Sequence, residues 1–177
     1  AGSGLRAVTA LDRRQWARLV AALDEAGKDL DFLLIDTASG ITDNVLDVVG
    51  LADYALVVTS YDPAAVVDAY AVIKLLTAVD REKPIGVVVN GARDAEEGGL
   101  VFRQIALAAE RFLSRSIRYD GYVPEDRAVK DATFAQMPVV GNLGNGNEAA
   151  GPASRCIRRL ACRLVAGCPR VPPRVPA

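Results

Sequence analysis

Polar side chains that could bind a ligand follow four apolar segments of this sequence, each at the same position relative to its segment. Carboxylate, hydroxyl and amide groups can accept or donate hydrogen bonds to a ligand, and carboxylates also bind cations. Any one group is weak evidence, but four at equivalent positions favour a site over coincidence. The residues are Asp36, Ser60 to Asp62, Asn90, and Glu125 with Asp126.

The apolar segments before these residues predict buried parallel strands. Four large apolar residues, Phe32 to Ile35, run directly into Asp36. Such a short unbroken run is typical of a strand that is covered on both faces. Open α/β sheets bind ligands outside the carboxyl ends of their strands, where the polar residues would converge. The other three expected strands are Tyr54 to Thr59, Pro84 to Val89, and Ile117 to Val123.

Helical patterns separate the expected strands. Asp12 is suited to cap a first helix that Gly27 ends, and Asp62 with Pro63 is suited to begin a later one. Repeated strand–helix–strand units imply right-handed crossovers, so we expect an open, mostly parallel α/β sheet with helices on both faces. The remaining helices are expected around Val45 to Gly50, from Val101 to Phe112 after a Gly98–Gly99 loop, after Pro124-Glu125-Asp126 to about Gln136, and from Pro152 through Leu164.

Composition argues for a soluble, cytoplasmic, globular protein. The 177 residues are 51% hydrophobic and 24% charged with a net charge of −1, which is atypical of disordered chains and of nucleic-acid binders. No apolar run is long enough to span a membrane, and the first residues do not resemble a signal peptide. The chain has no His, and its three Cys are six residues apart, a spacing that disfavours zinc or disulfide sites.

Several motifs occur in an order and spacing that resemble one family. They are Asp31 to Leu46, Asp68 to Lys74, Val87 to Asn90, Val101 with Phe102, Ala109 to Leu113, and Gly121 to Asp126. Together they resemble the MinD/ParA family of deviant P-loop ATPases, in particular its branch of flagellar-number regulators called FlhG or FleN. The resemblance covers roughly residues 2 to 166 and implies a partial nucleotide-binding domain over 1–166. Residues 167–177 would be a proline-rich, disordered tail.

The sequence departs from the family in two places. The turn Ala38-Ser39-Gly40 differs mildly from the family's small-Ala-Gly ending. More importantly, no Gly-rich loop ending in Lys-Ser/Thr occurs in this sequence. We therefore expect the chain to be the N-terminally truncated, C-terminal two-thirds of such an ATPase, inactive by itself. The family's P-loop strand lies between the strand ending at Asp36 and Tyr54 to Thr59, so we expect a gap there or direct pairing of those two strands.

The resemblance implies roles for the matching residues, with ATP or ADP and Mg²⁺ as the cofactors. Asp36 would be the catalytic carboxylate and hold Mg²⁺ through water, while Asn90 would hydrogen-bond the adenine edge. The second switch would be formed by Thr37, Ala38, Ser39 and Gly40, and the base and ribose would be lined by Pro124, Glu125 and Asp126. Structural alternatives remain open: Asp36 capping a turn, Asn90 capping a loop, and Glu125 with Asp126 beginning a helix.

Two kinds of function follow. In the first, the parent is an ATP-dependent molecular switch that controls flagellar number or placement. It would form a nucleotide-dependent homodimer, with a flagellar GTPase or a transcription regulator as partner, no direct contact with nucleic acid, and peripheral contact with the inner membrane. In the second, the chain is a catalytically inert protein-interaction module, and a MinD-like regulator of the division site is a further alternative.

Overall fold

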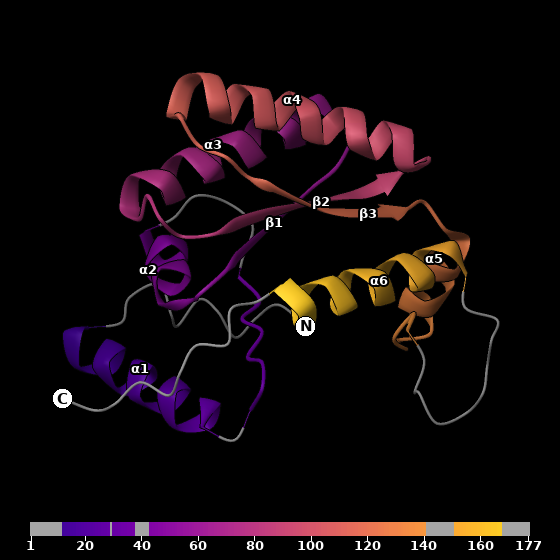
Figure 1. Ribbon diagram of the computed structural model, residues 1–177. Coiled ribbons are helices and arrows are strands. Elements are labelled where there is room, and N and C mark those ends of the chain that lie inside the picture. The colour runs from indigo at the N-terminus through magenta and orange to yellow at the C-terminus, as the bar shows by residue number, and fades with distance from the viewer. Residues whose placement is uncertain (1–11, 29, 38–42, 141–150, 168–177) are drawn as a thin grey trace. The chain divides into compact units, whose positions relative to one another are not determined.

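The computed structural model describes residues 12–28, 30–37, 43–140 and 151–167 (Figure 1). The chain divides into two compact units. The first contains residues 1–52 and 169–177, and the second contains residues 53–168.

The first unit contains helices α1 (Arg13–Gly27) and α2 (Asp43–Leu51). Helix α1 begins with a capping box. The Asp12 carboxylate accepts the N–H groups of Arg14 and Gln15 at 2.8 Å each, and the Gln15 side chain accepts the Asp12 N–H at 2.9 Å. These bonds satisfy N–H groups that have no partner within the helix. Both helices confirm the sequence-based expectation, including the end of α1 at Gly27.

The predicted strand from Phe32 to Ile35 is not present. Residues 32–37 form neither helix nor strand, and the side chains of Phe32, Leu34 and Ile35 are 45%, 88% and 38% exposed. A strand requires a hydrogen-bonded neighbour, and none of the described residues pairs with this segment. An apolar run alone therefore did not determine a strand. The expected gap between this segment and Tyr54 to Thr59, or their direct pairing, depends on the relative position of the two units and stays a prediction.

The second unit is built on a parallel sheet. Among the described residues it has three strands in the order β1 (Ala55–Thr59), β2 (Ile85–Ala92) and β3 (Arg118–Pro124). Strands β1 and β2 pair regularly, whereas the pairing of β2 with β3 shifts register twice, once near each end. The sequence predicted these three strands and their parallel direction correctly.

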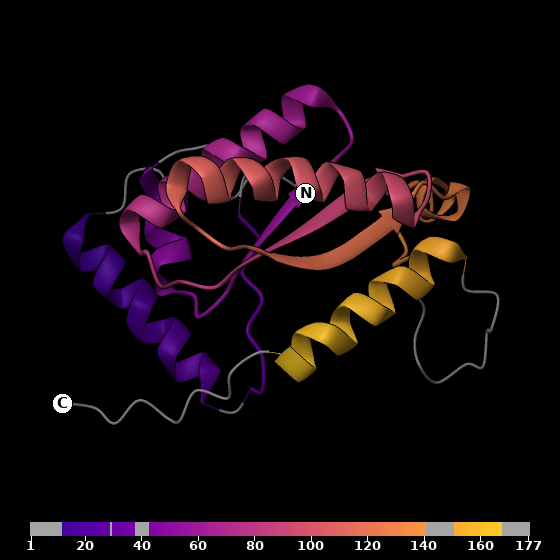
Figure 2. The same ribbon diagram turned by 45° about the horizontal axis from the view of Figure 1, so that its top comes forward.

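Helices cover both faces of this sheet. Helices α3 (Pro63–Val79) and α4 (Ala95–Leu113) lie on one side, and α6 (Pro152–Gly167) lies on the other, against β3 (Figures 1 and 2). The short helix α5 (Arg127–Phe134) follows β3. Within the described ranges, none of the helices is both long and apolar enough to cross a bilayer.

The core of the second unit lies between the sheet and helices α3 and α4. Ile73 of α3, Ile105 of α4 and Val87 of β2 are at most 1% exposed. Apolar residues at helical spacing on α3 and α4 thus meet β-branched residues of the central strand, which fit a pleated surface well. On β1, Val57 is buried on this side, while Val58 on the opposite side is 61% exposed.

The sequence-based expectation for the beginning of α4 was wrong. Gly98 and Gly99 are not a loop, because α4 begins at Ala95, where the Asp94 carboxylate accepts the Glu97 N–H at 2.9 Å. A Cβ atom on Gly98 would lie 2.8 Å from the Tyr119 hydroxyl oxygen, so glycine here permits close packing against β3. Phe112 is 69% exposed, since the buried stripe of α4 ends with Ala109.

Candidate functional site

The carboxyl edge of the sheet brings together three of the four polar groups. Because the strands are parallel, the segments after β1, β2 and β3 leave the sheet at one edge. Asn90 is opposite Val123 in the ladder, and the Glu125 N–H donates to the Ala92 carbonyl oxygen at 3.0 Å. That bond fixes the turn after β3 against the end of β2. The structure therefore places Asn90 beside the segment from Pro124 to Asp126.

Asn90 has a side chain available for a ligand. It is exposed, and among the described residues its amide makes no hydrogen bond. The register between β2 and β3 shifts after it, and Gly91 follows in the left-handed region with φ of 72°. A glycine adopts this conformation at little cost. The regular ladder therefore ends at Asn90. The structure does not show the loop-capping role that was the structural alternative for this residue.

The loop after β1 is stabilised by its own hydrogen bonds. The Asp62 carboxylate accepts the Ala64 N–H at 2.8 Å and so begins α3, as the sequence predicted. The Ser60 hydroxyl accepts the Asp62 N–H at 3.3 Å, and the Thr59 hydroxyl donates to the Ala65 carbonyl oxygen at 3.0 Å. These polar groups shape the edge, and their hydrogen bonds are structural.

Glu125 is engaged in an ion pair at the surface. Its carboxylate accepts a hydrogen bond from the Lys130 ammonium at 2.9 Å, and both side chains are exposed. The hydrogen bond and charge of Glu125 raise the pKa of Lys130. Exposed pairs of this kind are weak and readily exchanged for other partners, so the pair leaves Glu125 accessible to a ligand.

Asp126 has both carboxylate oxygens occupied. One accepts the Ala128 N–H at 2.9 Å and caps α5, and the other accepts the Ala153 N–H at 3.1 Å at the beginning of α6. These two backbone N–H groups hold the pKa of the Asp126 carboxyl below its usual range. The structure gives Asp126 the helix-capping role that sequence reasoning had left open. Its contact with a ligand stays a prediction.

The residues expected near the phosphates belong to the first unit. Asp36 is exposed and Thr37 is partly exposed, whereas Ala38, Ser39 and Gly40 lie outside the described residues. Within the described part of the chain, no cluster of three or more acidic or Cys side chains could hold a metal ion. The Mg²⁺ role of Asp36 through water and the switch role of Thr37 to Gly40 therefore stay predictions.

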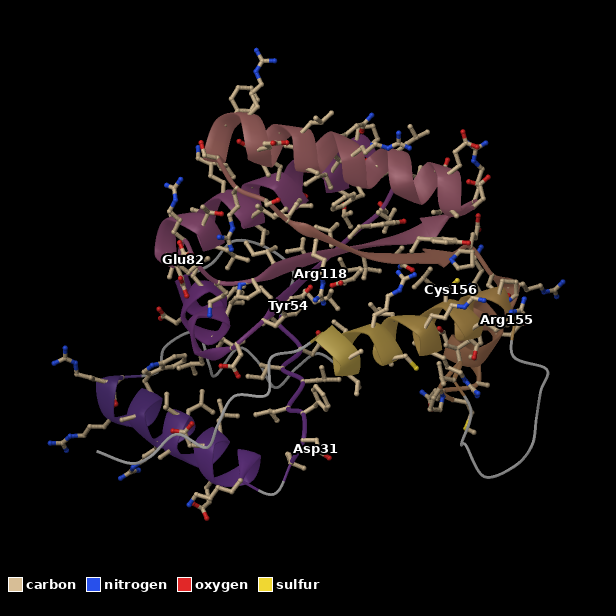
Figure 3. The ribbon with its side chains drawn as sticks, in the orientation of Figure 1. Asp31, Tyr54, Glu82, Arg118, Arg155 and Cys156 are labelled. Atoms are coloured by element: carbon tan, nitrogen blue, oxygen red, sulfur yellow. The ribbon has the colours of Figure 1, made fainter. Side chains whose placement is uncertain are left out.

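Sequence reasoning missed a polar cluster at the opposite, amino edge of the sheet. Asp120 is 2% exposed and accepts hydrogen bonds from the Tyr54 hydroxyl and from Arg118 Nε, both at 2.6 Å. The Arg118 guanidinium also lies over the Tyr54 ring at 4.7 Å (Figure 3). Burial, followed by the bond to Asp120, raises the pKa of Tyr54. The sequence signal that could have indicated this structural cluster is a pair of charged residues, Arg118 and Asp120, two positions apart inside a strand.

The residues of the carboxyl edge fit part of a nucleotide. A free amide at the end of β2 suits the donor and acceptor of a base edge, and the turn after Pro124 borders it. The sequence provides no Gly-rich loop for the phosphates. When bound, Mg²⁺ would neutralise phosphate charge; its assignment to Asp36 stays a prediction.

Comparisons with known proteins agree with this architecture. No protein-family model matches the chain. Antiactivator FleN of Pseudomonas aeruginosa is 34% identical over 139 residues, covering 78% of this chain and 50% of FleN. Flagellum site-determining protein YlxH of Helicobacter pylori is 27% identical over 111 residues, covering 61% of this chain and 37% of YlxH. The chain thus spans half or less of these relatives.

Solved structures give the same result. The MinD cell division protein of Aquifex aeolicus superposes with a TM-score of 0.64 at 26% identity, covering 93% of this chain and 64% of that one. A MinC:MinD complex from the same organism also gives a TM-score of 0.64 at 26% identity, covering 92% of this chain and 62% of that one. These similarities agree with the parallel α/β sheet and with the polar groups at its carboxyl edge. Together they show that the chain belongs to the MinD/ParA family of P-loop nucleoside triphosphatases.

Proposed function

We propose that this chain carries the base-binding part of an ATP-dependent molecular switch that regulates flagellar number or placement. The observation that carries the proposal is the unpaired, exposed amide of Asn90 beside the turn from Pro124 to Glu125. Two relatives support the cellular role, because FleN is an antiactivator and YlxH is a flagellum site-determining protein. The MinD cell division proteins support division-site placement as the alternative.

The adenine edge is the group that the Asn90 amide would recognise. An asparagine amide offers one acceptor and two donors, and adenine presents a matching amino donor and ring-nitrogen acceptor. Pro124 would border the base, and Glu125 could accept a hydrogen bond from a hydroxyl group after release from Lys130. The exposed position of both Glu125 and Lys130 makes that exchange inexpensive.

The phosphate end of the ligand requires more than this sequence contains. Phosphoryl transfer depends on a loop that positions the phosphates, a lysine and Mg²⁺. In the proposal, Asp36 holds Mg²⁺ through water and Thr37 to Gly40 respond to the terminal phosphate. The 177-residue chain itself does not hydrolyse ATP. In the complete protein, nucleotide would favour a homodimer, peripheral membrane contact and a partner protein, in keeping with the existence of a MinC:MinD complex.

The second candidate function is a nucleotide-independent interaction module. The observation in its favour is that Asp62, Glu125 and Asp126 already have intramolecular partners. Under this hypothesis the edge would be a structural turn region, and Asn90 would be its one unpaired amide among the described residues. The two candidates differ in a single measurable property, which is binding of the adenine base.

Binding of adenosine monophosphate (AMP) and guanosine monophosphate (GMP) by the ¹⁵N-labelled chain tests the proposal. We expect AMP at millimolar concentration to shift the backbone amide signals of Asn90 and Glu125, with GMP binding more weakly. Asn90→Ala should weaken AMP binding by about 1–3 kcal/mol, the cost of leaving the adenine edge unpaired where the bound base is buried. Gln104→Ala removes an exposed amide of α4 and is the matched control. Equal binding of AMP and GMP before and after Asn90→Ala would contradict the adenine assignment.

A further inference from the structure

The outer face of helix α6 carries arginines and no acidic residues. This helix packs against β3, on the side of the sheet opposite α3 and α4 (Figure 2). Its charged residues are Arg155, Arg158, Arg159 and Arg163, and it contains no Asp, Glu or Lys. Residues three, four and seven positions apart lie on the same side of a helix. Arg155, Arg158, Arg159 and Cys162 therefore share one side of α6, and all four are exposed.

This arrangement of arginines is unfavourable within the chain alone. Arg155 is three residues from Arg158 and four from Arg159, and like charges at these spacings repel each other. Among the described residues, neither Arg158 nor Arg159 has a hydrogen bond or an ion pair. Carboxylates supplied from outside would relieve the repulsion. The guanidinium group is suited to them, because its planar fork donates two parallel hydrogen bonds to one carboxylate.

The second half of the same helix is apolar on its outer side. Arg163 is the one charged residue after Arg159, and its guanidinium donates to the Asp120 carbonyl oxygen of β3 at 3.0 Å. A helix that is apolar all round is typical of one surrounded by protein. The composition of this half therefore predicts a cover on both sides, yet several of its apolar residues are exposed. They are Ala161, Cys162, Val165 (59% exposed) and Ala166.

A basic half followed by an apolar half fits a second helix. Protein interfaces combine an apolar centre with arginine, and small side chains let two helices approach closely. We propose that the outer face of α6 is a docking surface for an amphipathic helix of another protein. Carboxylates of that helix pair with Arg158 and Arg159, and its apolar side chains pack on Cys162 and Val165. The 16 residues of α6 offer about 24 Å of length for this contact.

The sizes of the apolar residues argue against an anionic membrane as the occupant. Helices that lie on a membrane insert large side chains such as Leu, Phe and Trp. The large apolar residues of α6 are Ile157, Leu160 and Leu164, and all three are partly buried in the chain. A net charge of −1 also gives the chain no general attraction to a polyanion such as nucleic acid. Docking on α6 goes beyond the proposed function and requires no nucleotide.

A designed peptide tests this surface on the full chain. The probe is an alanine-based helical peptide, one face of which carries glutamates in one half and leucines in the other. A scrambled peptide of the same composition is its control. NMR of the ¹⁵N-labelled chain follows the backbone amides, and mass spectrometry follows alkylation of the exposed Cys162 thiol. We expect shifts at Arg158, Arg159 and Val165, and alkylation of Cys162 about tenfold slower at a peptide concentration about ten times Kd.

Variants separate this surface from general charge attraction. Arg158→Gln together with Arg159→Gln removes two exposed guanidiniums, so we expect peptide binding to weaken by about tenfold. Val165→Gln alters only the apolar half, and we expect binding to weaken by about threefold. Arg13→Gln together with Arg14→Gln changes an exposed, adjacent pair on α1 and is the matched control. Unchanged amide signals of β2 show that each variant is folded.

Each outcome bears on the docking surface. Binding of the designed peptide that the α6 variants weaken and the α1 control does not would support it. Equal binding of the scrambled peptide, equal effects of the α6 and α1 variants, or no shift on α6 would overturn it. Vesicles of phosphatidylglycerol and phosphatidylcholine test the membrane. If they protect Cys162 and the designed peptide does not, the surface binds lipid and a partner helix is ruled out.

Discussion

Tyr54→Phe tests whether the polar cluster at the amino edge holds the sheet together. The substitution removes one hydroxyl and leaves a buried Asp120 carboxylate oxygen, 2% exposed as a residue, without its donor at 2.6 Å. Hydrogen bonds to charged groups contribute about 1.5–3 kcal/mol, so we expect a loss of that size in the free energy of unfolding. Arg118 is 40% exposed and keeps its bond to Asp120, so its partly solvated ion pair should limit the loss.

Urea denaturation followed by circular dichroism measures this loss. The midpoint should fall while the slope stays unchanged, because the surface exposed on unfolding is the same. Tyr61→Phe is the matched control, since that side chain is 59% exposed, and surface changes usually stay within about 0.5 kcal/mol. If Tyr54→Phe lowered the free energy of unfolding no more than Tyr61→Phe does, the buried hydrogen bond from Tyr54 to Asp120 would not contribute to stability, contrary to this prediction.

Three further predictions follow from single features. Gly98→Ala should destabilise the second unit by about 1–3 kcal/mol in urea denaturation, because the new methyl group would collide with Tyr119 and Tyr122; a neutral result would contradict the close packing of α4. The Asp126 carboxyl has a depressed pKa, so the stability it contributes should be complete above its ordinary value of 3.8 and lost as pH falls through the folded-state pKa. Acid denaturation of wild type and Asp126→Ala should therefore converge at low pH; a constant difference would argue against the caps. Finally, an assay of phosphate release from ATP should detect no turnover by the chain. Turnover that Asp36→Ala abolishes would contradict this expectation.

The fold was predictable where local pattern and tertiary environment agree. The segment between Pro84 and Asn90 is rich in β-branched residues, and it forms most of the central strand β2. Asp12, Asp62 and Pro152 marked the beginnings of helices correctly, because caps depend on nearby backbone groups. The prediction of a strand from Phe32 to Ile35 was wrong, because a strand also depends on a paired neighbour that no local pattern specifies.

The candidate site was predictable in position and not in detail. Parallel strands force Asn90 and Glu125 to one edge, so their proximity followed from topology. That Asp126 caps two helices did not follow, because Ala153 is far from it in sequence and the bond forms only when α6 packs on β3. Gly98 was misassigned for the same reason, as its role is defined by contacts with β3.

Photolabelling with 8-azido-AMP reports directly where the base lies on the chain. After irradiation and digestion, mass spectrometry identifies the labelled peptide. We expect label on peptides containing residues 60–62, 90–93 or 124–126, with loss of labelling in the presence of excess AMP and reduced labelling in Asn90→Ala. Label confined to the amino edge around Tyr54 and Arg118, or spread without protection by AMP, would contradict adenine binding at the carboxyl edge.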